Sequence, residues 1–278
     1  MSKRSPVLAI AQRELMDALR GRWVMLSGIL FAVLACSLSL FGMRSVGASG
    51  MAGFNRTAIS LLNLVLYLVP LLALLLSINS MSAEREDGPL EILLTQPISR
   101  AQIILGKFGG LAAALAAALL GGFGGAGLVI GLLGSDSAIW SYALLMLRSI
   151  GLGFVFVGLG LWISSAATTR LQALSRGLLL WFGLVILYDL AIVGATAFFG
   201  GAALKSALGV LVVANPVDLI RVSSIIHMGG DQSFGLTAQG LIAMLRGPGG
   251  SLLQAGALLV WIMGPVYGAV RTFARRDF

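Results

Sequence analysis

The sequence predicts an all-α integral membrane protein with six transmembrane helices and with both termini in the cytoplasm. Its composition and its long uncharged runs lead to this fold class. Of the 278 residues, 58% are hydrophobic and 11% are charged, and the mean hydropathy is +0.97. A water-soluble domain of this length could not bury so much apolar surface, so much of that surface is expected to face lipid.

Six runs are long enough to cross about 30 Å of hydrocarbon at a rise of about 1.5 Å per residue. They cover about residues 23–43, 58–82, 103–133, 140–167, 177–200 and 250–271. A six-span domain is therefore expected over residues 23–278, after a cytoplasmic segment of residues 1–22. An outer loop, 201–249, holds one further apolar run, 206–217, which is too short to cross and is expected near an interface.

Lysine and arginine gather on one side of these spans. The chain carries 19 Lys and Arg against 11 Asp and Glu, a formal net charge of +8. The positive-inside rule assigns the richer side to the cytoplasm, so the charge reports topology and not nucleic-acid binding. The predicted inner side has Lys3, Arg4, Arg13, Arg20, Arg22, Arg85, Arg100, Lys107, Arg170, Arg176, Arg271, Arg275 and Arg276. The outer side has Arg44, Arg56, Lys205, Arg221 and Arg246.

The residues before the first span, "SPVLAIAQRELMDALRGRW", predict an amphipathic helix. An apolar face recurs over about four turns, and the charged residues lie largely opposite to it. Such a helix is expected to lie on the inner membrane surface. The apolar face consists of Leu8, Ala11, Leu15 and Leu19.

Two ionisable residues fall within predicted spans, Arg148 in the fourth and Asp189 in the fifth. Each costs roughly 2.5–3.5 kcal/mol at the centre of a membrane helix. A direct ion pair between them would be strained, because their heights differ by on the order of 10 Å. Asp189 is expected to face a polar cavity or a partner subunit, and a protonated structural aspartate is the alternative.

The stretch "NPVDLIRVSSIIHM" in the outer loop predicts a short helix. Asn215 is expected to cap it, Pro216 to occupy the first position, and Asp218 to lie in the first turn. The apolar face of Leu219, Val222 and Ile226 either rests on the bilayer or docks to a partner outside the membrane.

The residues needed for several kinds of chemistry are missing. No G-x-x-x-x-G-K-[ST] phosphate-binding loop and no H-E-x-x-H motif occurs, and the chain has one histidine and one cysteine. These absences predict that the chain is not an enzyme and that it holds no catalytic site, no cofactor and no metal ion of its own.

Residues 84–100, "EREDGPLEILLTQPISR", form the longest predicted cytoplasmic loop. Gly88 and Pro89 are a helix start signal, and Pro97 ends the element. At about nine residues it spans roughly 13 Å, which is too short to cross a membrane. It is expected to insert its apolar face into a groove on another protein, and the alternative is a loop that only covers the helical bundle. The face consists of Leu90, Leu93 and Leu94.

At these residues the chain resembles the ABC-2 type transporter permeases. "EREDGPLEILLTQPISRAQIILGKF" is similar to the coupling segment of that family, and "IAQRELMDALRGRW" is similar to its N-terminal elbow helix. The resemblance implies a multi-pass homodimer in a bacterial inner membrane, bound to a separate cytoplasmic ATPase that holds ATP and Mg. The implied ATPase-coupling residues are Glu84, Glu86, Gly88, Leu90, Glu91, Leu93, Leu94 and Pro97.

Two shorter stretches, "LYDLAIV" and "NPVDLIR", resemble the permeases of nitrous-oxide reductase maturation. That resemblance implies a role in assembling copper centres, through transport of a sulfur species or copper or through force transmission to a periplasmic β-helical partner. The sparse Cys and His and the dispersed Met of this chain favour a sulfur species or force transmission over copper. The implied docking residues are Asn215, Pro216, Asp218 and Arg221.

Two other functions also fit the residues. One is a generic exporter of the same family that moves drugs, lipids or polysaccharide. The other is a membrane scaffold without a transport role, whose complex would show no partner-dependent stimulation of ATP hydrolysis.

Overall fold

The computed structural model describes residues 5–21, 28–37, 51–86, 88, 95–133, 136–198, 209–227 and 247–276. Within these ranges every regular element is a helix, as the sequence predicts. The helices are α1 (Pro6–Arg20), α3 (Met51–Glu86), α5 (Arg100–Leu133), α6 (Asp136–Ala166), α7 (Arg170–Phe182), the π-helical turn η1 (Gly183–Leu187), α8 (Tyr188–Phe198), α10 (Pro216–His227) and α12 (Pro248–Ala274).

Five helical segments of the described chain are long and apolar enough to cross a membrane. They are Ile59–Glu86, Arg100–Gly124, Ile139–Ala166, Arg170–Gly194 and Gly249–Ala274. They match the second to sixth predicted spans. Of the first predicted span, 23–43, the structure describes residues 28–37, which form the short apolar helix Gly28–Ser37.

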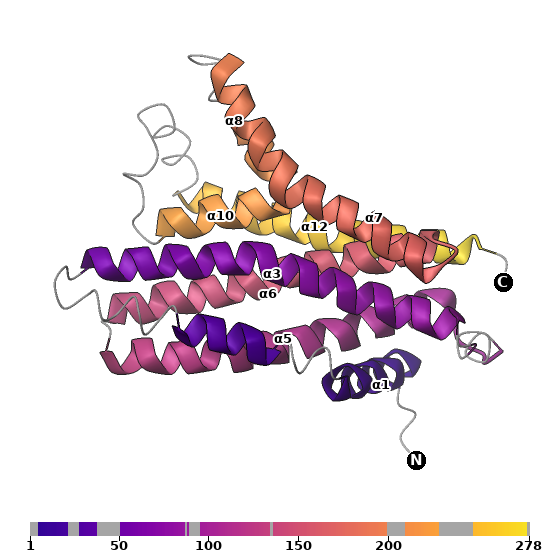
Figure 1. The fold of residues 1–278 in the computed structure, drawn as a ribbon. Coiled ribbons are helices and arrows are strands. Elements are labelled where there is room, and N and C mark those ends of the chain that lie inside the picture. The colour runs from indigo at the N-terminus through magenta and orange to yellow at the C-terminus, as the bar shows by residue number, and fades with distance from the viewer. Residues whose placement is uncertain are drawn as a thin grey trace.

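Helices α3, α5, α6 and α12 lie alongside one another as a bundle, and α1 packs against α5 near one end of it (Figure 1). The start of α1, the end of α3, the turn between α6 and α7 and the end of α12 share that end (Figure 1). This arrangement agrees with the charge distribution, because the basic residues of all these segments belong to the side that the positive-inside rule predicts to be cytoplasmic. The cytoplasmic location of this end stays a prediction from charge.

Helix α6 lies at the centre of the bundle. It contacts α3, α5, α10 and α12, and 61% of the residues in the apolar stretch of its candidate span are buried. In the span formed by α7, η1 and α8, 11% of the residues in the apolar stretch are buried. Helix α8 diverges from the other helices (Figure 1). Exposed apolar side chains of this span, such as Leu179 and Leu190, suit contact with lipid or with another protein.

Helix α1 packs on the bundle through a face other than the one predicted to lie on the membrane surface. Ile10, Glu14 and Ala18 are buried, whereas Leu8 and Leu19 are 49% and 43% exposed. The residues form the predicted helix, and the contact of its leucine face with the membrane surface stays a prediction. The reason for the packing face is steric, because α5 presents glycines where α1 crosses it.

Those glycines allow a close approach of the two helices. A Cβ atom at Gly106 would lie 2.7 Å from the Ile10 Cβ, and one at Gly110 would lie 2.5 Å from the backbone oxygen of Ala11. The spacing of four residues places both glycines on one face of α5, the small-xxx-small arrangement of membrane helix contacts.

Candidate functional site

The candidate site is the predicted cytoplasmic end of the bundle, around the segment that joins α3 to α5. The predicted leucine face, Leu90, Leu93 and Leu94, lies outside the described residues together with Glu91. Gly88 and residues 95–99 are described. The site is therefore built from the two flanks of the segment and from what each flank contacts.

Each flank has a local signal that fixes its helix end. Gly88 has a φ of +89°, in the left-handed region that glycine adopts without steric cost, and it follows shortly after the end of α3. At the other flank Pro97 is exposed and Ser99 caps α5. The Gln102 backbone N–H donates to Ser99 Oγ at 3.2 Å, and the Ser99 N–H donates to Gln102 Oε1 at 2.9 Å. This reciprocal pair is a capping box.

A buried ion cluster ties both flanks to α1. Lys107 of α5 is fully buried, and its Nζ pairs with Glu14 of α1 and, at 2.7 Å, with Glu84 Oε2 of α3. Ser80 Oγ donates to Glu14 Oε2 at 2.8 Å and accepts from Lys107 Nζ at 3.2 Å. Arg13 lies 3.8 Å from Glu84 at the exposed edge. A buried ammonium group is tolerated here because two carboxylates and a hydroxyl replace its water.

A second set of contacts ties the end of α3 to the turn between α6 and α7. The Arg170 backbone N–H donates to Glu86 Oε1 at 2.9 Å, and Arg170 Nε donates to Asn79 Oδ1 at 3.1 Å. Arg85 donates to the backbone oxygen of Ala167 in the same turn. The last turn of α3 is thus bonded to the start of α7.

Arginines cover the C-terminal carbonyl groups of α6 and α12. Arg100, the first residue of α5, donates to Phe273 O at 3.2 Å and to Ala274 O at 3.0 Å. Arg276 donates to Ala166 O at 3.1 Å and to Ala167 O at 2.6 Å. Cations at these positions satisfy unpaired carbonyls and complement the negative end of each helix dipole.

Glu84 and Glu86, which the family resemblance implies as ATPase-coupling residues, also make bonds within the chain. Their carboxylates bind Lys107 and the Arg170 N–H, and their contact with an ATPase stays a prediction. Glu84 has a side chain that is 17% exposed, whereas Glu86 is exposed. These bonds hold the end of α3, before the segment that leads to α5, against α5 and α7.

A second polar cluster lies where α8 meets α10. Arg221 Nη1 pairs with Asp189 of α8 and lies 2.9 Å from Asp218 Oδ1. Asn215 Nδ2 donates to Asp218 Oδ2 at 3.0 Å and to Leu184 O in the π-helical turn at 2.7 Å. Burial raises the pKa of the Asp218 carboxyl to about 7, against the opposing effect of Arg221.

The structure provides Asp189 with a partner that was not predicted. Its carboxylate pairs with Arg221 of the same chain, and its side chain is 31% exposed. Contact of Asp189 with a polar cavity or with a partner subunit stays a prediction. Arg148 does not pair with Asp189. It donates to Ser223 O at 3.1 Å, and its Nη2 lies 3.0 Å from His227 Nδ1. Both residues are on α10, and these contacts explain how a charged residue is accommodated in α6.

The predicted start of α10 is confirmed. The helix begins at Pro216, and the Val217 N–H donates to Asn215 Oδ1 at 2.9 Å. Its surroundings differ from both expectations, since nine of its twelve residues are buried against the bundle. Asn215, Pro216 and Asp218 thus have no surface for direct contact with a docked protein, whereas the Arg221 side chain is 21% exposed.

The Lys107 cluster is a structural feature of the candidate site that the sequence patterns did not predict. Lys107 is the one charged residue between Arg100 and Asp136, and a lysine within an apolar helix needs a carboxylate partner. That signal was present, but the partner Glu14 is 93 residues away.

Among the described residues, no three His, Cys, Asp or Glu side chains gather closely enough to hold a metal ion.

Comparisons with known proteins agree with the fold and with the motifs. The family described as "ABC-2 family transporter protein" matches residues 8–278. A protein of Stutzerimonas stutzeri named "Probable ABC transporter permease protein NosY" is 34% identical over 257 residues, 91% of this chain and 90% of the relative. A protein of the same name from Pseudomonas aeruginosa is 36% identical over 260 residues, 92% of this chain and 91% of the relative. The chain therefore belongs to the ABC-2 family of transporter permeases, as a membrane subunit similar to NosY.

Proposed function

We propose that this chain is a permease subunit whose cytoplasmic end is moved by a separate ATPase through the segment between α3 and α5. The observation that carries the proposal is the set of bonds at the two flanks of this segment. One flank is bonded to α1 and α7, and the other to α1 and α12. A displacement of the segment is therefore shared by three other elements, α1, α7 and α12.

The proposed movement follows from the stiffness of packed helices. A push on Leu90, Leu93 and Leu94 displaces the last turn of α3 and the first turn of α5. Lys107 then carries α1 along, because a buried ion pair is costly to break. Arg100 carries the end of α12 in the same way. ATP and Mg belong to the ATPase, since the chain has no phosphate-binding loop.

The test is a pair of substitutions on the predicted leucine face, Leu93→Asp with Leu94→Asp. The tagged permease is purified from membranes, and the ATPase that accompanies it is quantified. Loss of the ATPase with normal permease yield is expected, because two carboxylates cannot enter an apolar groove.

A matched control is Thr95→Asp with Gln96→Asp, which adds the same charge at exposed positions of the same segment. This pair is expected to retain the ATPase. Undiminished recovery with the leucine-face pair would disprove the coupling role of that face.

We further propose that two copies of the chain form the transporter. Few residues are buried in the apolar stretches of two candidate spans: 11% in the span of α7, η1 and α8, and 17% in that of α12. The share is 44–61% in the other three candidate spans. The low burial of the two spans leaves apolar side chains outside the face of Arg271, among them Leu190 and Leu259, available for a second copy. Light scattering of the purified permease that gave the mass of one chain would contradict this proposal.

The narrower role proposed here is copper-centre assembly for nitrous-oxide reductase, by transport of a sulfur species or copper or by force transmission to a periplasmic β-helical partner. Its support is the likeness to proteins named NosY and the two short motifs around Asp189 and Asn215. Arg221 is the proposed contact for the partner, because part of its side chain is exposed. Identification of the periplasmic proteins that purify with the chain tests this role, and their absence would favour a generic exporter.

A further inference from the structure

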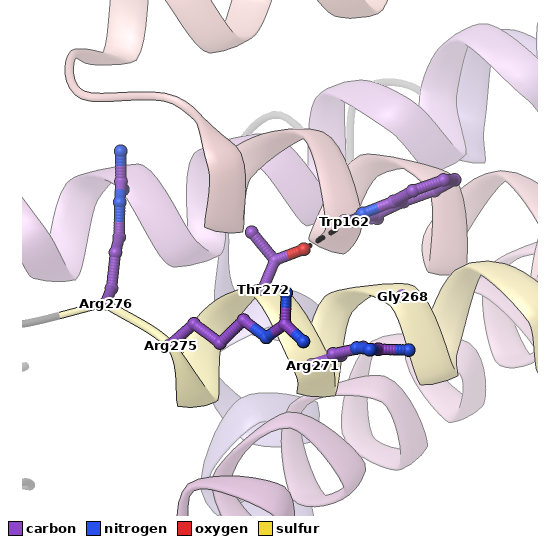
Figure 2. Close-up of a pocket in the computed structure, with 6 residues that line it drawn as sticks. All are labelled: Trp162, Gly268, Arg271, Thr272, Arg275 and Arg276. Carbon is purple, nitrogen blue, oxygen red and sulfur yellow. Dashed lines mark hydrogen bonds between the residues drawn. The ribbon is translucent and has the colours of Figure 1, made fainter.

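A cavity of about 440 Å³ lies between α6 and α12, where both helices reach the predicted cytoplasmic side. No step proposed above uses it. Figure 2 shows the side chains around it, which come from the ends of these two candidate spans. The lining residues are Trp162, Gly268, Arg271, Thr272, Arg275 and Arg276.

Two of its arginines lie on the same helical face and have no acidic partner among the described residues. Arg271 and Arg275 are four residues apart on α12, and Figure 2 shows both side chains extending to the same side of the helix. Within the described part of the chain, no carboxylate lies within ion-pair distance of either one. Like charges at this spacing repel each other, and a bound anion would remove that repulsion.

Nearby groups that could compete for these arginines are already engaged. The Phe273 and Ala274 carbonyls at the end of α12 accept from Arg100. The Ala166 carbonyl at the end of α6 accepts from Arg276. The negative ends of both helices are thus covered, and the cavity keeps a net positive lining.

The wall opposite the arginines is amphipathic. Trp162 Nε1 donates to Thr272 Oγ1 at 3.2 Å (Figure 2), and the indole is 43% exposed. A Cβ atom at Gly268 would lie 2.8 Å from the Trp162 Cε2, so the glycine lets the ring lie directly against α12. A tryptophan with one polar and one apolar side is typical of the boundary between headgroups and acyl chains.

An apolar track continues from this cavity along α12. Tyr267, Met263 and Val260 are 65%, 59% and 71% exposed, and they lie four, eight and eleven residues before Arg271. This spacing places all three on the same helical face as the arginine. The surface therefore offers cations at one end and an apolar stripe that leads toward the middle of the span.

From this arrangement we propose that the cavity binds the headgroup phosphate of an anionic phospholipid of the inner leaflet, such as phosphatidylglycerol, with its acyl chains along the α12 track. Basic pockets between membrane helices on the cytoplasmic side suit such headgroups. The apolar track distinguishes a lipid from a free phosphate ion, which would use the arginines alone.

Native mass spectrometry of the purified permease, titrated with phosphatidylglycerol or with zwitterionic phosphatidylethanolamine, tests the proposal. The unchanged protein is expected to retain phosphatidylglycerol and not phosphatidylethanolamine. The pair Arg271→Gln with Arg275→Gln is expected to weaken binding about 30-fold, which corresponds to about 2 kcal/mol from two cations near the membrane surface.

The matched control is Arg20→Gln with Arg176→Gln, which removes two exposed cations from the same predicted side but outside the cavity. This pair is expected to bind phosphatidylglycerol as the unchanged protein does. The pair Arg271→Lys with Arg275→Lys keeps both charges and is expected to retain most of the binding. It tests the role of the two charges even if the glutamine pair folds poorly.

Three results would overturn the proposal. The first is equal retention of the two lipids. The second is an equal loss in the cavity pair and in the control pair, which would make the effect one of net charge. The third is displacement of the lipid by the same concentration of soluble glycerol phosphate, which would identify the ligand as a free phosphate compound.

Discussion

Replacing Lys107 by methionine tests the reading of the cytoplasmic end most directly. The substitution keeps a long apolar side chain but removes the ammonium group that neutralises Glu14 and Glu84. The Glu14 carboxylate, whose side chain is 8% exposed, would remain in the interior without a cation. Breaking a buried pair in this way costs about 3–5 kcal/mol, which corresponds to a fall of roughly 6–20 °C in the unfolding temperature.

The assay is thermal unfolding of the purified permease in detergent. Arg20→Gln is the control, because it removes an exposed cation from α1 and is expected to change the free energy of unfolding by less than about 0.5 kcal/mol. Limited proteolysis adds an independent measure, since α1 is expected to become cleavable once its ion pair is lost.

A second substitution distinguishes ion pairing from a simple loss of packing. Glu14→Leu in the Lys107→Met background removes the unpaired carboxylate, while Glu84 keeps Arg13 at 3.8 Å. The double variant is therefore expected to be more stable than Lys107→Met alone. The reasoning is refuted if Lys107→Met unfolds at the same temperature as the unchanged protein, or if the two losses simply add.

Three further predictions concern other contacts. Gly110→Val is expected to destabilise the protein by about 1–3 kcal/mol, because its side chain would press on α1. Gly121→Val is the control, since a Cβ atom there meets open space. Equal unfolding temperatures of the two variants would contradict this prediction. Ser99→Ala removes the cap of α5 and is expected to cost about 1 kcal/mol, with Ser99→Asp as the variant that restores it in the same assay. Because burial raises the pKa of Asp218 to about 7, its contribution to stability is fully present below about pH 4 and is lost as the pH rises through about 7. Unfolding temperatures measured from pH 5 to pH 8 are expected to fall less in Asp218→Asn, and an identical pH dependence in both proteins would disprove the assignment.

Much of the fold follows from patterns along the chain. Hydropathy alone located the five candidate spans found in the described residues, because a membrane helix must satisfy its backbone internally over a fixed thickness. Helix ends with a local signal were also predictable. Asn215 and Pro216 begin α10 as their residue types require, and the Ser99–Gln102 pair has the spacing of a capping box.

The packing faces were not predictable in the same way. Apolar periodicity on α1 identified the face of Leu8 and Leu19 as a membrane face, but it did not predict that Ile10 and Glu14 are buried against the bundle. Lipid and protein interior are equally apolar, so hydropathy does not distinguish a face that meets lipid from one that meets a helix. The glycines of α5 decide the matter, because only there can the two backbones approach.

The partners of the charged residues depended on tertiary structure for a related reason. The sequence by itself determined that Lys107, Arg148 and Asp189 sit in or beside apolar spans and that each needs a counterpart. Their partners are 93, 75 to 79 and 32 residues away in the chain, and no periodicity relates such positions. Desolvation makes a buried charge costly wherever it lies, but only the crossing of α1, α3 and α5, and of α6, α8 and α10, decides which opposite charge or carbonyl is near enough to offset that cost.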